Sequence, residues 1–185
     1  CNGWQPIITT LHGYHANQQD DYHKYKIAPV LNDPEQLSQW RVFSQNQSEP
    51  LPALIHFDTG MNRLGFDPDQ SDWLVNNKSA IDGIRCLAIM SHLASAEIYN
   101  DPKNAVQLAA FSKIRSSFVG MPSSLANSAG CLLSPDYHFQ ITRPGIALYG
   151  VHPAGQLTYE LKPVVRWLAR ILQIREAKAG DSVGY

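Results

Sequence analysis

Residues 53–68 read ALIHFDTGMNRLGFDP, and the order of features in this stretch decides the expected fold. An apolar run of strand length (53–57) leads into a polar loop with two glycines, and the loop ends at Asp67-Pro68. Aspartate is a good N-cap and proline suits the first helical position, so a helix is expected to begin here. The stretch therefore predicts a strand, a loop and the start of a helix in succession.

The same Asp-Pro signal recurs at Asp33-Pro34 and Asp101-Pro102, each 34 residues from Asp67-Pro68. Gln36 and Gln70 stand at the third position of the first two expected helices, as in a capping box. Apolar residues at helical spacing then predict helices at 34–43, 68–80 and 102–119. Apolar runs alternate with these helices and predict strands at 27–31, 53–57, 84–90, 124–126 and 146–149.

Strands that alternate with helices predict a parallel α/β architecture, either a TIM-type (β/α)8 barrel or an open doubly wound sheet. A tetratricopeptide array has the same period, but it needs two helices per unit and no strands. The sequence contains no Gly-x-Gly-x-x-Gly or Walker-type loop that would favour the nucleotide-binding open sheet. A full barrel takes about 250 residues, so we expect residues 1–156 to form a partial β/α barrel.

The character of the sequence changes after residue 151. His152-Pro153-Ala154-Gly155 is typical of a turn or linker. The β-branched residues within 161–176 and a turn signal at Gly180-Asp181 favour strands, although 168–172 is also compatible with a helix face. We therefore expect 157–185 to begin a β-rich C-terminal domain, and the chain to be the middle of a longer polypeptide.

Composition excludes several classes of protein. The 185 residues are 44% hydrophobic and 17% charged, with a net charge of −1, which argues against disorder and against nucleic-acid binding. The apolar runs are far shorter than the roughly 20 residues of a membrane helix. Three widely spaced cysteines (Cys1, Cys86 and Cys131) fit neither a disulfide framework nor a zinc site. They favour a reducing compartment, so we expect a cytoplasmic protein.

Polar groups flank the expected strands in four places, at 58–65, 91–97, 127–130 and 143–145. In a β/α barrel the chemistry lies in loops at the carboxyl ends of the strands, so these groups are candidates for one site. Each place also has a plainer interpretation: a turn, a core histidine, a helix cap, or a turn with an ion pair. Ser128 and Gly145-Ile146 offer a hydroxyl and unobstructed backbone N–H groups, which suit a phosphate.

Four segments together resemble bacterial alanine racemase, a family that depends on pyridoxal 5'-phosphate: DTGMNRLG (58–65), SHLASA (91–96), ANSA (126–129) and RPGIALYG (143–150). The ordered set is more specific than any one motif, and the resemblance runs from about residue 27 onward. It implies a cofactor-binding barrel, a β-rich domain and a homodimer with shared active sites. The implied activity interconverts L- and D-alanine through a cofactor aldimine and two-base proton transfer at Cα, supplying D-alanine for peptidoglycan.

By matching motifs, the resemblance implies cofactor-binding roles for five residues. Ser128, Gly145 and Ile146 would hold the cofactor phosphate. His92 would pack beside the pyridine ring. Arg143 would donate a hydrogen bond to the pyridine nitrogen, and because arginine does not give up its proton, that nitrogen would stay uncharged. An uncharged ring is a weaker electron sink, which favours reprotonation at Cα over transamination.

The resemblance also implies a substrate-binding residue and a catalytic base. Arg63 would lie near the cofactor's phenolic oxygen and the substrate carboxylate. Val183-Gly184-Tyr185 matches the family's Val-(Ser/Gly)-Tyr-Gly pattern as far as it goes, which makes Tyr185 the candidate base. The family's Lys-Ala-(Asn/Asp)-Ala-Tyr-Gly pattern, which contains the Schiff-base lysine, does not occur in the chain. We expect that lysine to precede Cys1, and the chain alone to be inactive.

Other functions stay open from the sequence. A broad-specificity or serine racemase of the same fold differs in residues that set substrate size. A non-catalytic barrel protein that binds pyridoxal phosphate would not need the segment 161–185. A metal hydrolase could use His12, His15 and His23 near Asp20-Asp21, but a strong site needs further ligands at the strand ends, so we expect no metal.

Overall fold

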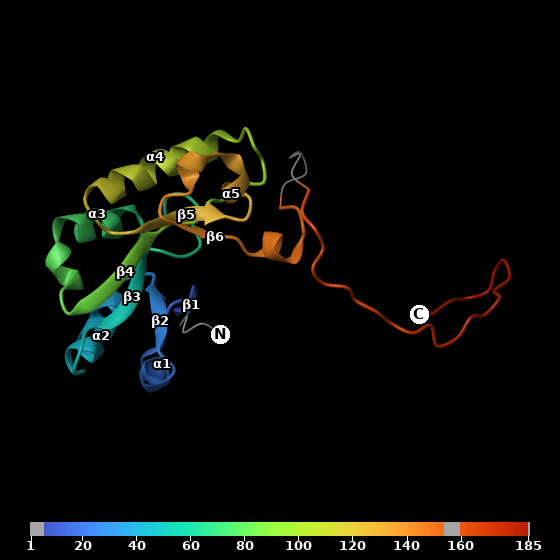
Figure 1. The fold of residues 1–185 in the computed structure, drawn as a ribbon, viewed down its shortest axis with the longest axis horizontal. Helices are drawn as coiled ribbons and strands as arrows, with labels where there is room; N and C mark the ends of the chain where they lie inside the picture. The colour runs from blue at the N-terminus through green and yellow to red at the C-terminus, as the bar shows by residue number, and fades with distance from the viewer. Residues whose placement is uncertain (1–5, 154–159, 185) are drawn as a thin grey trace.

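The computed structural model describes residues 6–153 and 160–184. Its centre is a curled sheet of six strands in which each strand pairs in parallel with the next along the chain (Figure 1). The strands are β1 (Ile8–Thr10), β2 (Ile27–Leu31), β3 (Leu51–His56), β4 (Ile84–Met90), β5 (Ser123–Asn127) and β6 (Ile141–Arg143). A doubly wound sheet would reverse its strand order at one point. The uninterrupted order therefore identifies the fold as a partial TIM-type barrel, as the sequence predicted.

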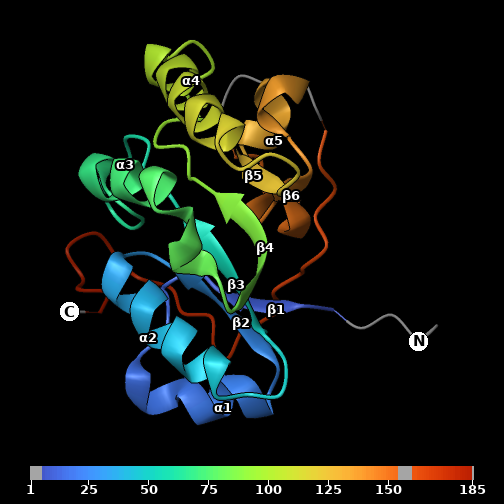
Figure 2. The same cartoon turned by 90° about the vertical axis from the view of Figure 1, so that its left-hand side faces the viewer.

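Helices follow the strands and cover one face of the sheet, with α2, α3 and α4 side by side in Figure 2. The α-helices are α1 (Gln19–Lys24), α2 (Pro34–Gln45), α3 (Pro68–Asn76), α4 (Pro102–Ser116) and α5 (Gly130–Leu133). Short 3-10 helices are η1 (Ala16–Gln18), η2 (Lys78–Ile81), η3 (Pro135–Tyr137) and η4 (Ile146–Tyr149). No helix in the described part of the chain is long and apolar enough to cross a membrane.

The three Asp-Pro pairs begin helices, as predicted. The Asp33 and Asp67 carboxylates each accept a backbone N–H at 2.8 Å, from the third helical residue, and Asp101 accepts one at 2.9 Å, from the second. Only Asp67 completes a capping box, because the Gln70 side chain accepts the Asp67 N–H at 3.2 Å. The corresponding Gln36 side chain instead accepts a backbone N–H from the end of β2.

Two apolar layers enclose the sheet. The larger lies between strands and helices and includes Trp40, Phe57 and Phe111, all at most 1% exposed. The smaller, formed by Ala28, Val30, Leu54, Ala88 and Met90, lies on the concave face. Successive strand residues point to opposite faces, so a strand that is buried on both faces is apolar along its whole length. Residues 53–57 follow this rule at every position except His56.

The prediction of a strand at 146–149 is wrong. These residues form η4, and the strand is the preceding β6, whose Arg143 pairs with Asn127 of β5. Pro144 has no N–H to continue the ladder. After it, Leu148 donates its N–H to the Gly145 carbonyl at 3.0 Å and closes a turn. Arg143 is therefore the last residue of a strand and lies at the carboxyl edge of the sheet.

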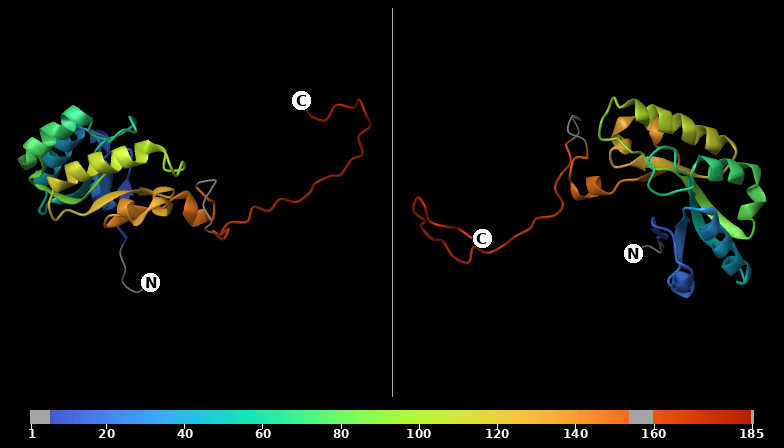
Figure 3. Two further views of the ribbon diagram at one scale, coloured as in Figure 1. Left: turned by 90° about the horizontal axis from the view of Figure 1, so that it is seen from above. Right: turned by 180° about the vertical axis from the view of Figure 1, so that it is seen from behind.

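The sequence did not predict β1 and α1. The described C-terminal segment, 160–184, differs from the rest of the chain because it does not pack as helix or strand against the sheet. Within 160–184 the chain forms a turn at residues 179–180 but neither helix nor strand, and Figure 3 shows it running away from the sheet. Its apolar side chains are exposed, Trp167 at 91% and Leu172 at 96%. The β-rich domain at 157–185 therefore stays a prediction.

Candidate functional site

Polar side chains gather where the parallel strands end. Asn32 follows β2, His56 ends β3, His92 follows β4, Ser128 follows β5 and Arg143 ends β6. Because all six strands run in the same direction, these positions share one edge of the sheet. Three of the five are residues that the sequence singled out.

Ser128 and the turn after β6 form a small cradle of hydrogen-bond donors. The Ser128 Oγ accepts the backbone N–H of Gly145 at 2.7 Å and that of Ala147 at 3.3 Å. A Cβ on Gly145 would lie 3.9 Å from this oxygen, so glycine leaves the space beside the hydroxyl open. Asn127 holds the other side by accepting the Gly130 N–H at 2.9 Å. Serine keeps its own proton to donate, so the cradle suits an oxyanion.

The structure brings Gly145 to Ser128, as the phosphate hypothesis requires, but the second N–H of the cradle is that of Ala147. The sequence singled out Ile146 for this place. Ile146 is the first residue of the four-residue η4, and its side chain is 52% exposed. A turn directs its N–H groups according to backbone angles, which the sequence does not display. The sequence therefore does not mark Ala147, and the role of Ile146 stays a prediction.

Arg143 is held by residues that follow β4 and lie within β5. Its Nη1 donates to Ser124 Oγ, and its Nη2 donates to the Ser91 carbonyl at 2.6 Å and the Leu125 carbonyl at 3.4 Å. Among the described residues no carboxylate pairs with this guanidinium. Burial lowers the pKa of Arg143 to about 10, which still leaves it charged at neutral pH. The site therefore contains a half-buried positive charge that favours anions and lone pairs.

His92 is neutral, and its proton position follows from its neighbour. Burial, and then the positive charges of Arg143 and Arg63, lower the pKa of His92 to about 4. Arg143 Nη2 lies 3.4 Å from His92 Nδ1, and because a guanidinium can only donate, Nδ1 must accept. The ring proton is therefore on Nε2.

His56 is a second neutral histidine at the same edge, and no motif in the sequence marks it. It is 6% exposed, and its Nδ1 lies 2.8 Å from Asn32 Oδ1. The Asn32 amide nitrogen donates to the carbonyls of Val30 and Leu11, so its oxygen faces the ring and His56 Nδ1 donates. Burial and then the Arg143 charge lower the pKa of His56 to about 4. The available signal was a lone histidine near the end of an apolar run.

Arg63 is presented on a tightly built loop. The Asp58 carboxylate accepts the N–H groups of Gly60 and Met61 at 2.9 and 2.8 Å. Gly65 closes the loop at φ +108°, where a Cβ would lie only 2.8 Å from the Asp58 nitrogen. The Arg63 side chain is exposed, and its charge acts on the pKa values of both histidines. Tyr185 lies outside the described residues.

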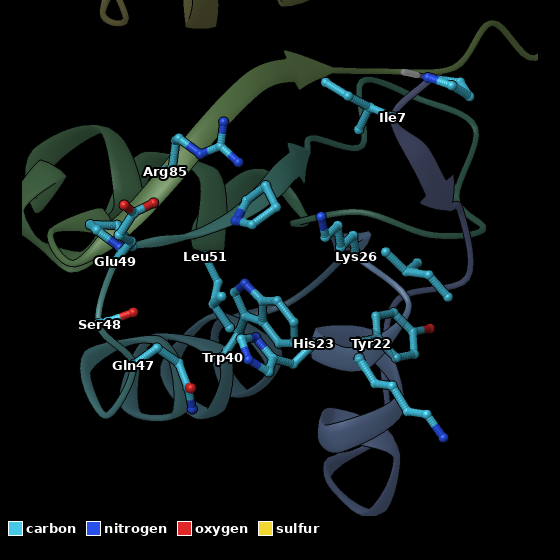
Figure 4. A pocket seen from close by; sticks show the side chains of 15 residues that line it. Ile7, Tyr22, His23, Lys26, Trp40, Gln47, Ser48, Glu49, Leu51 and Arg85 are labelled. Carbon is cyan, nitrogen blue, oxygen red and sulfur yellow. The ribbon is translucent and has the colours of Figure 1, made fainter. Parts of the chain in front are cut away.

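Two cavities lie elsewhere. One of about 660 Å³ opens at the amino ends of the strands, among Lys26, Trp40, Leu51 and Arg85 (Figure 4). The other, of about 380 Å³, lies between α3 and α4 on the far side of the Arg63 loop. The candidate residues line neither, because they stand on the open edge of a partial barrel. Within the part of the chain that the structure describes, no three His, Cys, Asp or Glu side chains cluster as a metal site.

Fold and site together define a class: a parallel β/α barrel with an oxyanion cradle after its last strands and a half-buried cation beside a neutral imidazole. A phosphate site in the loops after the late strands is frequent in such barrels. Residues 2–153 match the family model described as alanine racemase, N-terminal domain, and the chain belongs to this family.

Individual relatives agree. The chain is 38% identical to alanine racemase of Methylobacterium nodulans over 96% of its own length and 48% of the relative's. It is 39% identical to the biosynthetic alanine racemase of Agrobacterium fabrum, over 96% of the chain and 45% of the relative. A crystal structure of Bartonella henselae alanine racemase with covalently bound pyridoxal phosphate superposes with a TM-score of 0.80 at 34% identity, covering 85% of this chain and 46% of that one. The chain thus spans about half the length of the curated relatives it matches.

Proposed function

We propose that this chain is part of an alanine racemase that interconverts L- and D-alanine with pyridoxal 5'-phosphate. The observation that carries the proposal is the shared edge of the sheet, where Ser128 and Gly145 meet and Arg143 meets His92. The family assignment and the relatives' names support the same activity. When bound, pyridoxal phosphate supplies an electron-withdrawing ring that acidifies the Cα proton of an attached amino acid.

The residues present fit this cofactor. The N–H groups of Gly145 and Ala147 donate to Ser128 Oγ, so the hydroxyl keeps its own proton for a phosphate. The N–H groups of Gly145 and Ile146 would complete the contacts with the phosphate when it is bound. The open space beside Gly145 gives the phosphate access without a side chain in the way. The cradle uses hydroxyl and backbone donors, so it needs no lysine or arginine.

Arg143 would determine the charge of the cofactor ring. A guanidinium that donates to the ring nitrogen cannot pass its proton on, so that nitrogen stays uncharged. The carbonyls of Ser91 and Leu125 hold the guanidinium in place, and no carboxylate in the described chain competes for it. The uncharged ring withdraws less electron density from Cα. A proton therefore returns to Cα more readily, and transamination is suppressed.

The other candidates divide the remaining tasks. His92, neutral because of its burial beside Arg143, would pack against the ring without adding charge. Arg63, whose side chain is exposed at the same edge, would bind the substrate carboxylate. Tyr185 would move a proton on one face of Cα, a role that rests on the Val183-Gly184-Tyr185 motif.

We extend the proposal to assembly and location. The partial barrel at 1–156 would bind the cofactor and 157–185 would begin a β-rich domain. The enzyme would be a cytoplasmic homodimer with shared active sites that supplies D-alanine for peptidoglycan. Relatives named biosynthetic and catabolic match the chain at 39% and 38% identity, so expression with and without external alanine would separate the two uses.

The test uses the full-length protein. It should bind pyridoxal phosphate, seen as cofactor absorbance, and convert L-alanine to D-alanine in a chiral assay. Faster turnover of serine than of alanine would favour a serine or broad-specificity racemase. Bound cofactor with no turnover of any amino acid would favour a non-catalytic binding protein, and failure to bind the cofactor would overturn the proposal.

A further inference from the structure

The buried face of α4 contains the side-chain amide of Gln107. Leu108, Phe111, Ile114 and Phe118 are spaced as an apolar helix face, but Asn104, Gln107 and Phe111 are the buried residues of α4. Gln107 is only 2% exposed. Burying a primary amide is costly unless its donors and acceptor are paired, so the partners of Gln107 show what it does.

The Gln107 amide joins two loops of the candidate site. Its Nε2 donates to the His92 carbonyl at 2.9 Å and to Thr59 Oγ1 at 3.4 Å. Its Oε1 accepts the Ala94 N–H at 2.8 Å. Reversing the amide would set an oxygen against the His92 carbonyl and an NH₂ against the Ala94 N–H, so the orientation is determined.

Thr59 continues this connection to the half-buried cation. Its Oγ1 pairs with Ser91 Oγ at 2.7 Å, and the Ser91 carbonyl accepts Arg143 Nη2 at 2.6 Å. Hydrogen bonds therefore link Arg143 to the Ser91 carbonyl, the Ser91 hydroxyl to Thr59, and Thr59 to Gln107. Gln107 extends this chain of contacts to the backbone of His92. Gln107 is the one member that lies on a helix, and helices are more rigid than loops.

We propose that Gln107 is a positioning residue of the racemase site, which holds the His92 loop and the loop that carries Arg63 at a fixed separation. The inference rests on the proposed function, in which these loops flank the cofactor and the substrate carboxylate. Gln107 acts through the His92 backbone and through Thr59, four residues before Arg63. Fixed separation matters because a displacement of about 1 Å can slow an enzyme about 100-fold.

The first test compares three variants of the full-length, cofactor-loaded protein. Gln107→Met keeps the length of the side chain and removes its hydrogen bonds, and Thr59→Val removes the hydroxyl. We expect each to lower kcat/KM for alanine about 10-fold, and the double variant to be about as slow as Gln107→Met, because both changes break one connection. Gln39→Met is the matched control, because the Gln39 amide on α2 bonds Glu35 at the surface, and it should leave kcat/KM unchanged.

The second test does not depend on activity. In the cofactor-free protein labelled with ¹⁵N-histidine, the His92 Nδ1 signal should report an unprotonated nitrogen in contact with Arg143. Gln107→Met should shift or broaden this signal, whereas the signal of His138, which bonds the Cys131 carbonyl, should stay in place. If Gln107→Met does not fold, Gln107→Glu serves, since it keeps the acceptor for the Ala94 N–H and loses both donors.

The outcomes separate this inference from the proposed function. A moved His92 signal in a wild-type protein without racemase activity would support the positioning role and refute the activity. Variants that melt at lower temperature, yet keep wild-type kinetics and an unmoved His92 signal, would show that Gln107 only stabilises the fold. Independent, multiplying losses in the double variant would likewise overturn the proposal.

Discussion

Replacing Ser128 with alanine removes the side chain at the centre of the phosphate cradle. The hydroxyl accepts two backbone N–H groups, at 2.7 and 3.3 Å, and keeps its own proton for the phosphate. A hydrogen bond to a charged group contributes about 1.5–3 kcal/mol, or roughly 10- to 150-fold in affinity. Gly145 is exposed, so its N–H stays available to the phosphate in the variant. We therefore expect cofactor affinity to fall toward the lower limit, about 10- to 30-fold.

The assay is a titration of the cofactor-depleted, full-length protein with pyridoxal phosphate, followed by absorbance and by recovered activity. At saturating cofactor, kcat should return close to the wild-type value, because Ser128 contacts the phosphate and not the reacting atoms. Ser116→Ala is the matched control, since that hydroxyl bonds only the Lys113 carbonyl on the exposed side of α4. Unchanged cofactor affinity in Ser128→Ala, or a loss of kcat that excess cofactor does not restore, would refute the assignment.

Three other predictions test the chemistry and the loop. The pKa values of His56 and His92 are about 4 in the folded chain, against about 6.5 when unfolded, so the unfolded chain binds more protons between these values. The free energy of unfolding should thus fall as pH drops from about 6.5 to 4, by up to about 3 kcal/mol per histidine. In His56→Gln the urea concentration at the unfolding midpoint should depend less on pH across this range. A pH dependence of the midpoint equal to that of the wild type would contradict this prediction. Arg143→Glu should let the ring nitrogen protonate and raise the fraction of transamination product, measured by chromatography, and an unchanged product ratio would count against its role. Gly65→Ala should lower the free energy of unfolding by about 1–3 kcal/mol, because its Cβ would meet the Asp58 backbone at φ +108°, and an unaltered melting curve would argue against the strain.

Local chemistry explains which elements the sequence predicted well. An aspartate that caps a helix acts on N–H groups two or three residues away, so Asp33, Asp67 and Asp101 signal their helices without help from the rest of the chain. The run 84–90 is a strand with the predicted bounds because it is apolar enough to be buried in a sheet. The run 146–149 is equally apolar, but Pro144 ends the ladder before it, and its side chains stay exposed.

The site was predictable only where a motif marks it. Ser128, Arg143, Gly145 and His92 belong to recognisable segments, and the structure brings them together in pairs at one edge. Asn32 and Gln107 belong to none, and their importance comes from partners distant in sequence. Gln107 is a polar residue on the buried face of α4, and only its contacts with the two loops explain why it is there.

By itself, the sequence determined the alternation of strands and helices, the helix starts, and the family, because each depends on residues close together in the chain. The tertiary structure decided the rest. It selected a curled parallel sheet over an open one, placed Arg143 at the end of a strand, and half-buried it beside His92. The neutral state of both histidines also depends on that placement, since burial near the Arg143 guanidinium lowers a pKa only when the fold brings the groups together.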